Sequence, residues 1–338
     1  MISIRRCESD DVHPLMDFIE QHWKQGHVLA HSKRLMDWQH ATASGYNYIL
    51  AWDGDVLIGA LGYIPTARFD ASLTGTNILW LALWKMRRDY NSSLIGVKLL
   101  YELSSLEPNI GIAVNGINDS VARLYGALGY ATAELKQYCL VNVKAERALL
   151  KYPKGFCLPK PKHGPALLKI MSASDLEKLK LPIDSLSHKT PAYFIERFIK
   201  HPFYEYKVYG VQQDKNISAL LALRTVRHQD AAAVRIVDFS GDVTTLASCG
   251  TALQGLMESE GAEYVDFWQY GIPDSALVGS GFQRVNPDGD FICPNYFEPF
   301  DRSNARICCA FKTQRDSSLI ICKADGDQDR PNILSASD

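Results

Sequence analysis

The chain carries one order of predicted elements twice, and this repeat constrains its fold more than any other feature. Each copy begins with a strand and a helix, continues through a hairpin and a long strand, and ends with alternating helices and strands. The expected elements cover 2–4, 12–23, 46–64, 77–86, 94–103, 111–114, 120–128 and 133–143 in the first copy, and 166–171, 174–180, 191–199, 207–225, 232–239, 245–260 and 264–269 in the second. This order predicts a duplicated α+β domain, with two unrelated α+β domains as the alternative.

A proline-rich segment separates the two copies. Residues 152–165 contain four prolines and several lysines, a composition typical of a linker. We therefore expect a first domain over 1–150, a linker over 151–165 and a second domain over 166–338. Each domain is expected to hold a mixed, mostly antiparallel sheet flanked by helices. Within the first, Asp53-Gly54-Asp55 predicts a tight hairpin turn.

Composition argues against several classes of protein. Apolar residues make up 46% of the chain, and no apolar run approaches the ~20 residues that a membrane span needs. We expect a soluble, cytoplasmic protein, because the first residues lack the apolar stretch of a signal peptide. Lys and Arg number 36 against 38 Asp and Glu, so nucleic-acid binding is not expected. The eight cysteines form no C-x-x-C pair, so we expect reduced thiols and no metal site.

The stretch VNGINDSVARLYGALGY has the pattern of a strand end followed by a capped helix. Asn118, Asp119 or Ser120 can accept hydrogen bonds from the first helical N–H groups. Apolar residues then recur at helical spacing, among them Tyr125, and Gly129 suits a left-handed helix stop. On this pattern alone, Tyr125 can equally be a packed core tyrosine.

The same stretch resembles the last conserved motif of the GCN5-related N-acetyltransferases. The resemblance lies in an Asn near the helix start, an Ala, a Leu-Tyr pair and a closing Leu-Gly-Tyr. In that family the Asn lies near the coenzyme A arm, and the Tyr can protonate the departing thiolate. The resemblance implies acyl-CoA as co-substrate, with Asn118 beside it and Tyr125 as general acid. It also implies that the two domains are tandem acetyltransferase-like domains.

A second resemblance follows the long strand, where the family places its pyrophosphate loop. Backbone N–H groups that turn into a helix N-terminus bind anions, and the family loop reads Gln/Arg-x-x-Gly-x-Gly/Ala. Only Gly96 matches outright, since Leu94 stands at the first glycine position. The implied loop comprises Asn91, Ser92, Ser93, Leu94, Ile95 and Gly96, with an ordinary strand-to-helix connection as the alternative.

The strand before this loop is where the resemblance places the reaction. An unprotonated amine attacks the thioester, and backbone N–H groups of the strand bind the oxyanion. Leu83, Trp84 and Met86 are the donors that the resemblance implies here. Residues 79–86 include no Asp, Glu or His, so the carboxylate that many relatives use as a base is missing.

Another group must then act as the base, or water must. His27, His31 and His40 precede the hairpin, a region that borders the acceptor site in this fold. Among them we favour His31 as the base. A surface or packed histidine is the alternative.

The second copy has no comparable loop. Its long strand ends in Asp238-Phe239-Ser240-Gly241-Asp242, and acidic side chains repel phosphate where amides would have to receive it. We therefore expect one coenzyme A site per chain, with the second domain as a substrate platform or a structural partner. The polar run 323–332 is expected to be an ordered tail against the body, or an edge of the second substrate's site.

The whole layout is similar to two-domain N-acyltransferases that act on nucleotide-linked sugars in bacterial surface-polysaccharide biosynthesis. The similarity includes HPFYEY at 201–206, YFEPF at 296–300 and the Asp-rich tail. It implies transfer of an acetyl to 3-hydroxybutyryl-type group from acyl-CoA to the amine of a dTDP-linked amino-dideoxy sugar, with aromatic stacking on the nucleotide. An aminoacyl-tRNA-dependent peptidyl transferase and a non-catalytic binding protein are the alternatives. The oligomeric state stays open.

Overall fold

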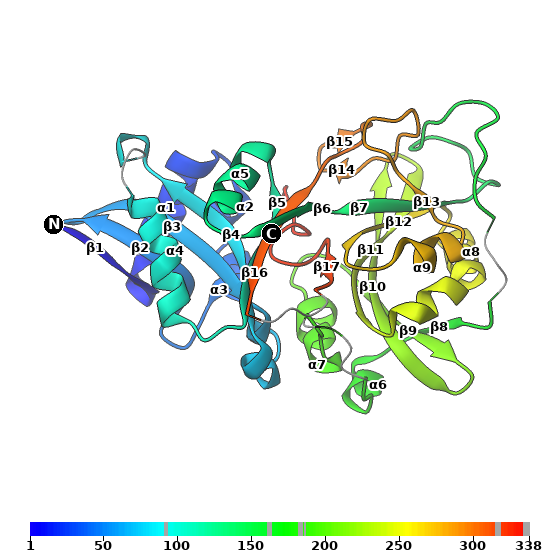
Figure 1. Cartoon of the computed structure of the whole chain (residues 1–338), viewed down its shortest axis with the longest axis horizontal. Helices are drawn as coiled ribbons and strands as arrows, with labels where there is room; N and C mark the ends of the chain where they lie inside the picture. The colour runs from blue at the N-terminus through cyan, green and yellow to red at the C-terminus, as the bar shows by residue number, and fades with distance from the viewer. Residues whose placement is uncertain (91–93, 161–163, 182–184, 186, 315–318, 334–338) are drawn as a thin grey trace.

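Two mixed sheets, each covered by helices, form the body of the protein (Figure 1). The computed structural model describes residues 1–90, 94–160, 164–181, 185, 187–314 and 319–333. The α+β class and the tandem arrangement expected from the sequence are confirmed. Within these ranges, none of the helices has both the length and the apolar character needed to cross a membrane.

The first sheet has the strand order β1-β2-β3-β4-β5-β16-β6. Its strands are β1 (Ile2–Glu8), β2 (Gly45–Asp53), β3 (Val56–Pro65), β4 (Ile78–Met86), β5 (Gly111–Ile117), β16 (Cys308–Thr313) and β6 (Ala131–Glu134). Neighbours pair antiparallel except β4 and β5, which run parallel. The hairpin expected between β2 and β3 is confirmed, and the φ of 56° at its Gly54 is the left-handed conformation that favours glycine.

The second sheet repeats this plan, with the order β8-β9-β10-β11-β12-β7-β13. Its strands are β8 (Leu167–Ile170), β9 (Lys207–Gln213), β10 (Asn216–His228), β11 (Ala231–Gly241), β12 (Ala262–Tyr270), β7 (Lys136–Val141) and β13 (Gln283–Arg284). Again one neighbouring pair, β11 and β12, is parallel. A short strand, β17 (Ile321–Cys322), pairs with β12, and β14 (Tyr296–Phe297) pairs with β15 (Phe300–Asp301) in a separate hairpin.

The two sheets exchange one strand each. In each sheet, the strand beside the parallel pair comes from the other copy: β16 lies between β5 and β6, and β7 lies between β12 and β13. Residues 133–143, expected to close the first domain, are divided between β6 in the first sheet and β7 in the second. Each sheet therefore contains a strand from the other side of the linker expected over 151–165. Periodicity indicates that a strand is present, but it does not specify the sheet that the strand joins.

Helices cover both faces of the first sheet. The helices of the first unit are α1 (Val12–Phe18), α2 (Val28–His31), α3 (Lys33–His40), α4 (Ile95–Leu106) and α5 (Asp119–Ala127). The second unit contains α6 (Ala173–Glu177) and α7 (Pro191–Phe194) before β9, and α8 (Gly250–Ser259) and α9 (Asp274–Gly279) after β11. α4 and α5 pack on the face that carries Ile49 and Leu79. α1 to α3 pack on the opposite face, which carries Tyr48 and Leu50, because successive strand residues point to opposite faces.

One buried cluster joins the two units. It contains Trp80 and Ala113 of the first sheet, Leu220 and Trp268 of the second, and Phe198 from the segment after α7. Each of these residues is at most 3% exposed. Full burial of a large apolar side chain stabilises a fold by about 1.5–3 kcal/mol. The shared core therefore holds the two units together as one body.

The tail segment, residues 319–333, runs between the two units, in red in Figure 1. Arg197 donates to the carbonyl oxygens of Ala324 and Gly326 at 3.0 and 2.7 Å. Near its end, Arg330 Nη2 lies 2.9 Å from Nε2 of His27 in the first unit. These contacts confirm the expectation of an ordered tail against the body.

Candidate functional site

β4 and β5 part before either strand ends. Their parallel pairing stops at Leu81 and Val114, while β4 continues to Met86 and β5 to Ile117. Beyond that point β4 keeps β3 as its neighbour and β5 keeps β16. Within the described ranges, the facing edges of the two strand ends have no strand between them, so a gap opens at the carboxyl ends of two parallel strands.

The ladder with β3 determines which amides of β4 face this gap. The Arg87 N–H donates to Ile58 O at 2.9 Å, and hydrogen-bonding residues alternate along an antiparallel ladder. Leu83 therefore directs its backbone groups toward β3, while Trp84 and Met86 direct theirs toward the gap. Of the three expected donors, this geometry favours Trp84 and Met86.

α4 begins close to the end of β4. Leu94 stands at its N-cap and is 74% exposed, and a leucine side chain cannot accept hydrogen bonds from the first-turn N–H groups. The indole Nε1 of Trp84 donates to Gly96 O at 3.1 Å, which ties the helix start to β4. The remaining expected loop residues, Asn91, Ser92 and Ser93, lie outside the described residues.

α5 begins just after β5, on the other side of the gap. Asn118 Oδ1 accepts from the Val121 N–H at 3.0 Å and from Ser120 Oγ at 2.7 Å. The predicted cap is confirmed, and it is Asn118. The helix ends as predicted, since Gly129 has a φ of 80°. Asn118 is exposed, so its side chain is open to a ligand at this helix N-terminus.

Replacing Asn118 with alanine should lower the free energy of unfolding by about 1 kcal/mol, because one first-turn N–H loses its acceptor. It should also weaken coenzyme A binding if the ligand contacts this helix start. Urea unfolding and calorimetric titration with coenzyme A measure the two effects. Ser120→Ala is the matched control, since Ser120 Oγ donates to the cap but satisfies no helical N–H in this contact. Equal behaviour of the two variants would contradict the assignment.

Tyr125 lies in the core beneath the ends of β4 and α4. Its ring centroid is 5.7 Å from that of Trp84 and 5.1 Å from that of Tyr130, and the residue is 1% exposed. Burial, with a smaller contribution from Tyr130, raises the pKa of its hydroxyl. The hydroxyl is therefore neutral at physiological pH and able to donate a proton. Trp84 thus contacts both Tyr125 and Gly96, and the role of Tyr125 as general acid stays a prediction.

The three histidines differ in their surroundings. His31 lies at the surface, with Nε2 2.9 Å from Glu20 Oε2 and a side chain 55% exposed. Its role as the base stays a prediction. His27 and His40 are buried, and burial lowers the pKa of each to about 3, so both are neutral. His40 Nδ1 lies 3.1 Å from Tyr63 O.

In the second sheet, the equivalent gap is filled by the chain itself. β11 and β12 pair as far as Ile236 and Phe267. Beyond that point β17 pairs with β12, and the Ala324 N–H donates to Val237 O of β11 at 2.9 Å. The tail segment thus forms backbone hydrogen bonds with the facing edges of both β11 and β12. The acidic residues at the end of β11 did not indicate this pairing in the sequence. The gap in the first sheet is left as the candidate site.

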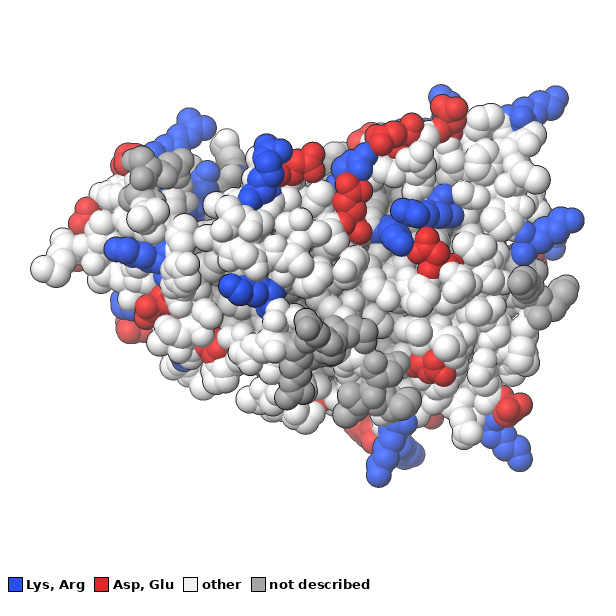
Figure 2. All heavy atoms as spheres, viewed as in Figure 1, with Lys and Arg blue, Asp and Glu red and all other residues white. Residues whose placement is uncertain are grey.

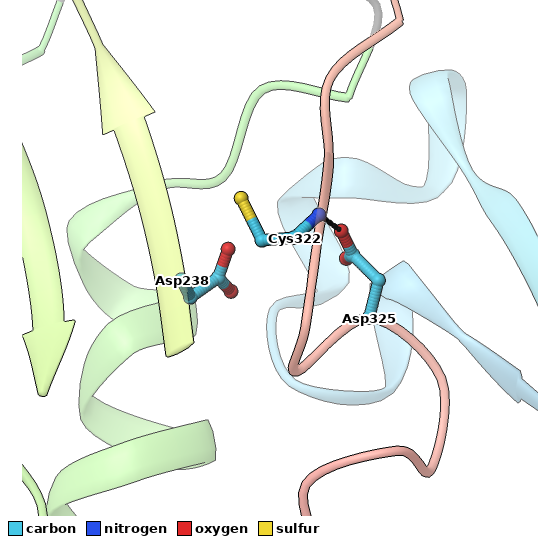
Figure 3. A group of neighbouring side chains, drawn as sticks. All are labelled: Asp238, Cys322 and Asp325. Atoms are coloured by element: carbon cyan, nitrogen blue, oxygen red, sulfur yellow. Dashed lines mark hydrogen bonds between the residues drawn. The ribbon is translucent and has the colours of Figure 1, made fainter. Parts of the chain in front are cut away.

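A buried ion cluster fastens this inserted segment. Asp238, Cys322 and Asp325 bring two carboxylate oxygens and a sulfur atom within 4.8 Å of one another (Figure 3). Such a group could hold a metal ion, but the Lys189 ammonium contacts both carboxylates and lies 2.8 Å from Asp325 Oδ1. Both aspartates have fully buried side chains. The lysine therefore supplies the cation that these buried carboxylates require.

The fold resembles solved structures of GCN5-related N-acetyltransferases. Such a protein from Anabaena variabilis ATCC 29413 matches with a TM-score of 0.55 and 10% identity, over 93% of this chain and 73% of that one. A conserved protein of Enterococcus faecalis V583, described as a probable N-acyltransferase, matches with a TM-score of 0.53 and the same identity and coverage. No protein-family model and no curated protein matches the sequence. At this identity the likeness establishes the fold, so the chain has the expected tandem GCN5-related N-acetyltransferase fold.

Proposed function

We propose that the protein is an acyl-CoA-dependent N-acyltransferase. The gap between β4 and β5, flanked by the N-termini of α4 and α5, is the observation that carries this proposal. An extended pantetheine arm can pair with the free edge of β4 as an added strand does. The helix N-termini favour the coenzyme's phosphates.

The groups around the gap have the chemistry that acyl transfer needs. When an amine attacks the thioester carbon, a C–N bond forms and negative charge develops on the carbonyl oxygen, which the N–H groups of Trp84 and Met86 can bind. The C–S bond then breaks, and the thiolate takes the hydroxyl proton of Tyr125. A proton from the new C–N nitrogen restores that hydroxyl, so the products are an amide and a free thiol.

The acceptor that we propose is a dTDP-linked amino-dideoxy sugar. A cavity of about 310 Å³ lies between the two units, and its lining includes Lys136, Arg284, Arg306 and Glu134. The ion pairs of these cations are solvent-exposed and hence weak, so they can be exchanged for a pyrophosphate. Cys308 of β16 pairs with Ile117 of β5 on one side and with the cavity residue Glu134 of β6 on the other. The edge of the cavity at Glu134 therefore lies two strand spacings, or ~10 Å, from β5. A sugar nucleotide could extend from the cavity to the gap.

Exposure separates the aromatic residues of the second unit that could stack on a nucleotide base from those that belong to the core. Tyr264, Phe267 and Trp268 are at most 2% exposed and belong to the core. Tyr296 is 48% exposed. Tyr296 is therefore the ring that we propose for contact with the nucleotide base.

The charge on one face of the molecule, together with 36 Lys and Arg against 38 Asp and Glu in the chain, does not favour the alternative that uses aminoacyl-tRNA. On the face drawn in Figure 2, Lys and Arg side chains are interspersed with Asp and Glu. A tRNA ligand calls for a clustered basic surface, because its affinity depends on neutralising several phosphates. We therefore place the acyl-CoA-dependent reaction first.

The proposal is tested by free-thiol release from acetyl-CoA through 3-hydroxybutyryl-CoA, with dTDP-amino-dideoxyhexoses as acceptors and each substrate omitted in turn. We expect thiol release that requires both substrates, and an N-acylated sugar by mass spectrometry. Retention on immobilised coenzyme A provides a second readout. An aminoacyl-tRNA-dependent enzyme and a non-catalytic binding protein both predict no thiol release and no retention.

A further inference from the structure

We propose that Asp327, in the tail segment, binds the amino group of the acceptor, an inference that rests on the proposed N-acyltransferase function. The tail approaches the first sheet on the face opposite α4 and α5. Ile321 and Ala324 belong to the same buried cluster as Trp80, whereas Leu79 and Leu81 pack with α4 and α5. An acceptor that enters from this opposite face meets the tail.

The neighbours of Asp327 in the chain place it where β4 and β5 part. A Cβ added at Gly326 would lie 3.6 Å from Trp80 Cβ and 3.9 Å from the carbonyl oxygen of Leu81, the last residue of β4 that pairs with β5. On the other side, the Gln328 side chain occupies the space beside Gly116 of β5, 2.2 Å from where a Cβ would be. Asp327 is thus held between residues that touch the two diverging strands.

Among the three buried aspartates of the tail, Asp327 has the longest contacts. Asp325 accepts from the Cys322 N–H at 2.7 Å and meets Lys189 at 2.8 Å. Asp329 accepts from Arg224 at 3.0 Å and from Tyr206 at 2.7 Å.

Asp327 itself is 8% exposed, and its described contacts are longer, 3.3 Å from Arg330 Nε and 3.4 Å from Gln328 Nε2. Because a carboxylate has about four lone-pair sites, two long contacts leave it able to accept more hydrogen bonds. A buried carboxylate in this condition suits a cationic or hydrogen-bond-donating ligand.

Arg330 is the cationic neighbour of Asp327, and Tyr48 and His40 of the first unit are neutral. Tyr48 of β2 lies in one row of the sheet with Gly62 of β3 and Leu83 of β4, and its ring covers Gly62, whose added Cβ would lie 2.5 Å from it. The pKa of the Tyr48 hydroxyl is raised by burial first and then by the charge of Asp327, and Arg330 lowers it. Tyr48 OH lies 3.5 Å from His40 Nε2. An ammonium group bound to Asp327 would share this carboxylate with Arg330.

The inferred role is binding, so no covalent bond forms or breaks at Asp327. Its carboxylate pairs with the ammonium form of the acceptor and positions the nitrogen at the gap. One proton then leaves to water, and the neutral amine attacks the thioester. The ligand class that follows is a primary amine, and a hydroxyl in the same place should bind less tightly.

The test compares two ligands on the coenzyme A complex by calorimetry: dTDP-4-amino-4,6-dideoxyglucose and its counterpart with a hydroxyl in place of the amine. Wild-type protein should prefer the amine by roughly 10- to 100-fold. Asp327→Asn should abolish that preference while leaving coenzyme A affinity unchanged. Glu298→Gln removes a carboxylate that bonds Tyr204 OH near the tail, and this control should retain the preference.

The outcomes separate this inference from the proposed function. A wild-type protein that binds no coenzyme A contradicts the N-acyltransferase itself. Binding of coenzyme A with equal affinity for the two sugars, or a preference that survives Asp327→Asn, overturns the role of Asp327 alone. If Asp327→Asn fails to fold, Asp327→Ser takes its place in the comparison, because serine also lacks the charge and has a smaller side chain.

Discussion

Replacing Lys189 with methionine is expected to lower the free energy of unfolding by about 3–5 kcal/mol, because two buried carboxylates lose their cation. The Lys189 ammonium contacts both Asp238 and Asp325, whose side chains are fully buried. Methionine keeps a similar length and apolar stem but carries no charge. Urea unfolding followed by circular dichroism gives the change in stability. Limited proteolysis should in addition show release of the tail segment.

The matched control is Lys200→Met. Lys200 pairs with Glu196 at 2.6 Å, but its side chain is 60% exposed. Removing such a surface pair should change stability by no more than about 0.5 kcal/mol. If Lys189→Met is as stable as this control, the buried cluster does not fasten the tail.

Replacing Tyr125 with phenylalanine should lower kcat by about 100-fold or more, since the departing thiolate loses its proton donor. The ring remains, so its packing against Trp84 and Tyr130 is kept. The dissociation constant for coenzyme A should therefore stay the same. Steady-state thiol release and calorimetric titration measure the two quantities.

Tyr130→Phe is the control for this effect, because it removes the hydroxyl of the ring that packs against Tyr125. Burial raises the pKa of the Tyr130 hydroxyl as well, to about 12. Its kcat should equal that of wild type. Since the pKa of Tyr125 lies above its ordinary value of 10.0, its hydroxyl stays protonated, and wild-type kcat should show no loss from this group up to pH ~9. Full turnover by Tyr125→Phe would instead identify Tyr125 as a core tyrosine only.

Features that depend on a few neighbouring residues could be predicted from the sequence. The turn at Gly54, the Asn118 cap and the helix stop at Gly129 each arise from local hydrogen bonds or from a positive φ. The contact of Tyr125 with Trp84 could not be predicted in this way, because it depends on how α5 packs against β4.

Features that depend on distant pairings could not be predicted. β16 and β17 lie beyond the last element expected from the sequence, and nothing in their local pattern indicates that one completes the first sheet and the other fills the second gap. The acidic residues at the end of β11 suggested only that the second copy repels phosphate and holds no coenzyme A site. The structure shows instead that Asp238 pairs with Lys189 beneath an occupied gap.

Asp327 was missed as a site residue for the same reason. The alternating Asp residues of the tail indicated a polar turn, and that pattern treats Asp325, Asp327 and Asp329 alike. Only the lengths of their contacts distinguish them: Lys189 lies 2.8 Å from Asp325 and Arg224 lies 3.0 Å from Asp329, whereas Arg330 lies 3.3 Å from Asp327. A linear sequence does not record such distances.

The strand exchange also has a consequence for synthesis of the protein on the ribosome. β5 ends at Ile117, but the strand that joins it to β6 begins at Cys308. At the ~5–20 residues per second of translation, roughly 10–40 s separate the two events. During that time the edges of β5 and β6 are templates for pairing with other chains. The sheet that carries the candidate site is therefore completed only after β7 to β13 of the second sheet have been made, although its own first strand is made first.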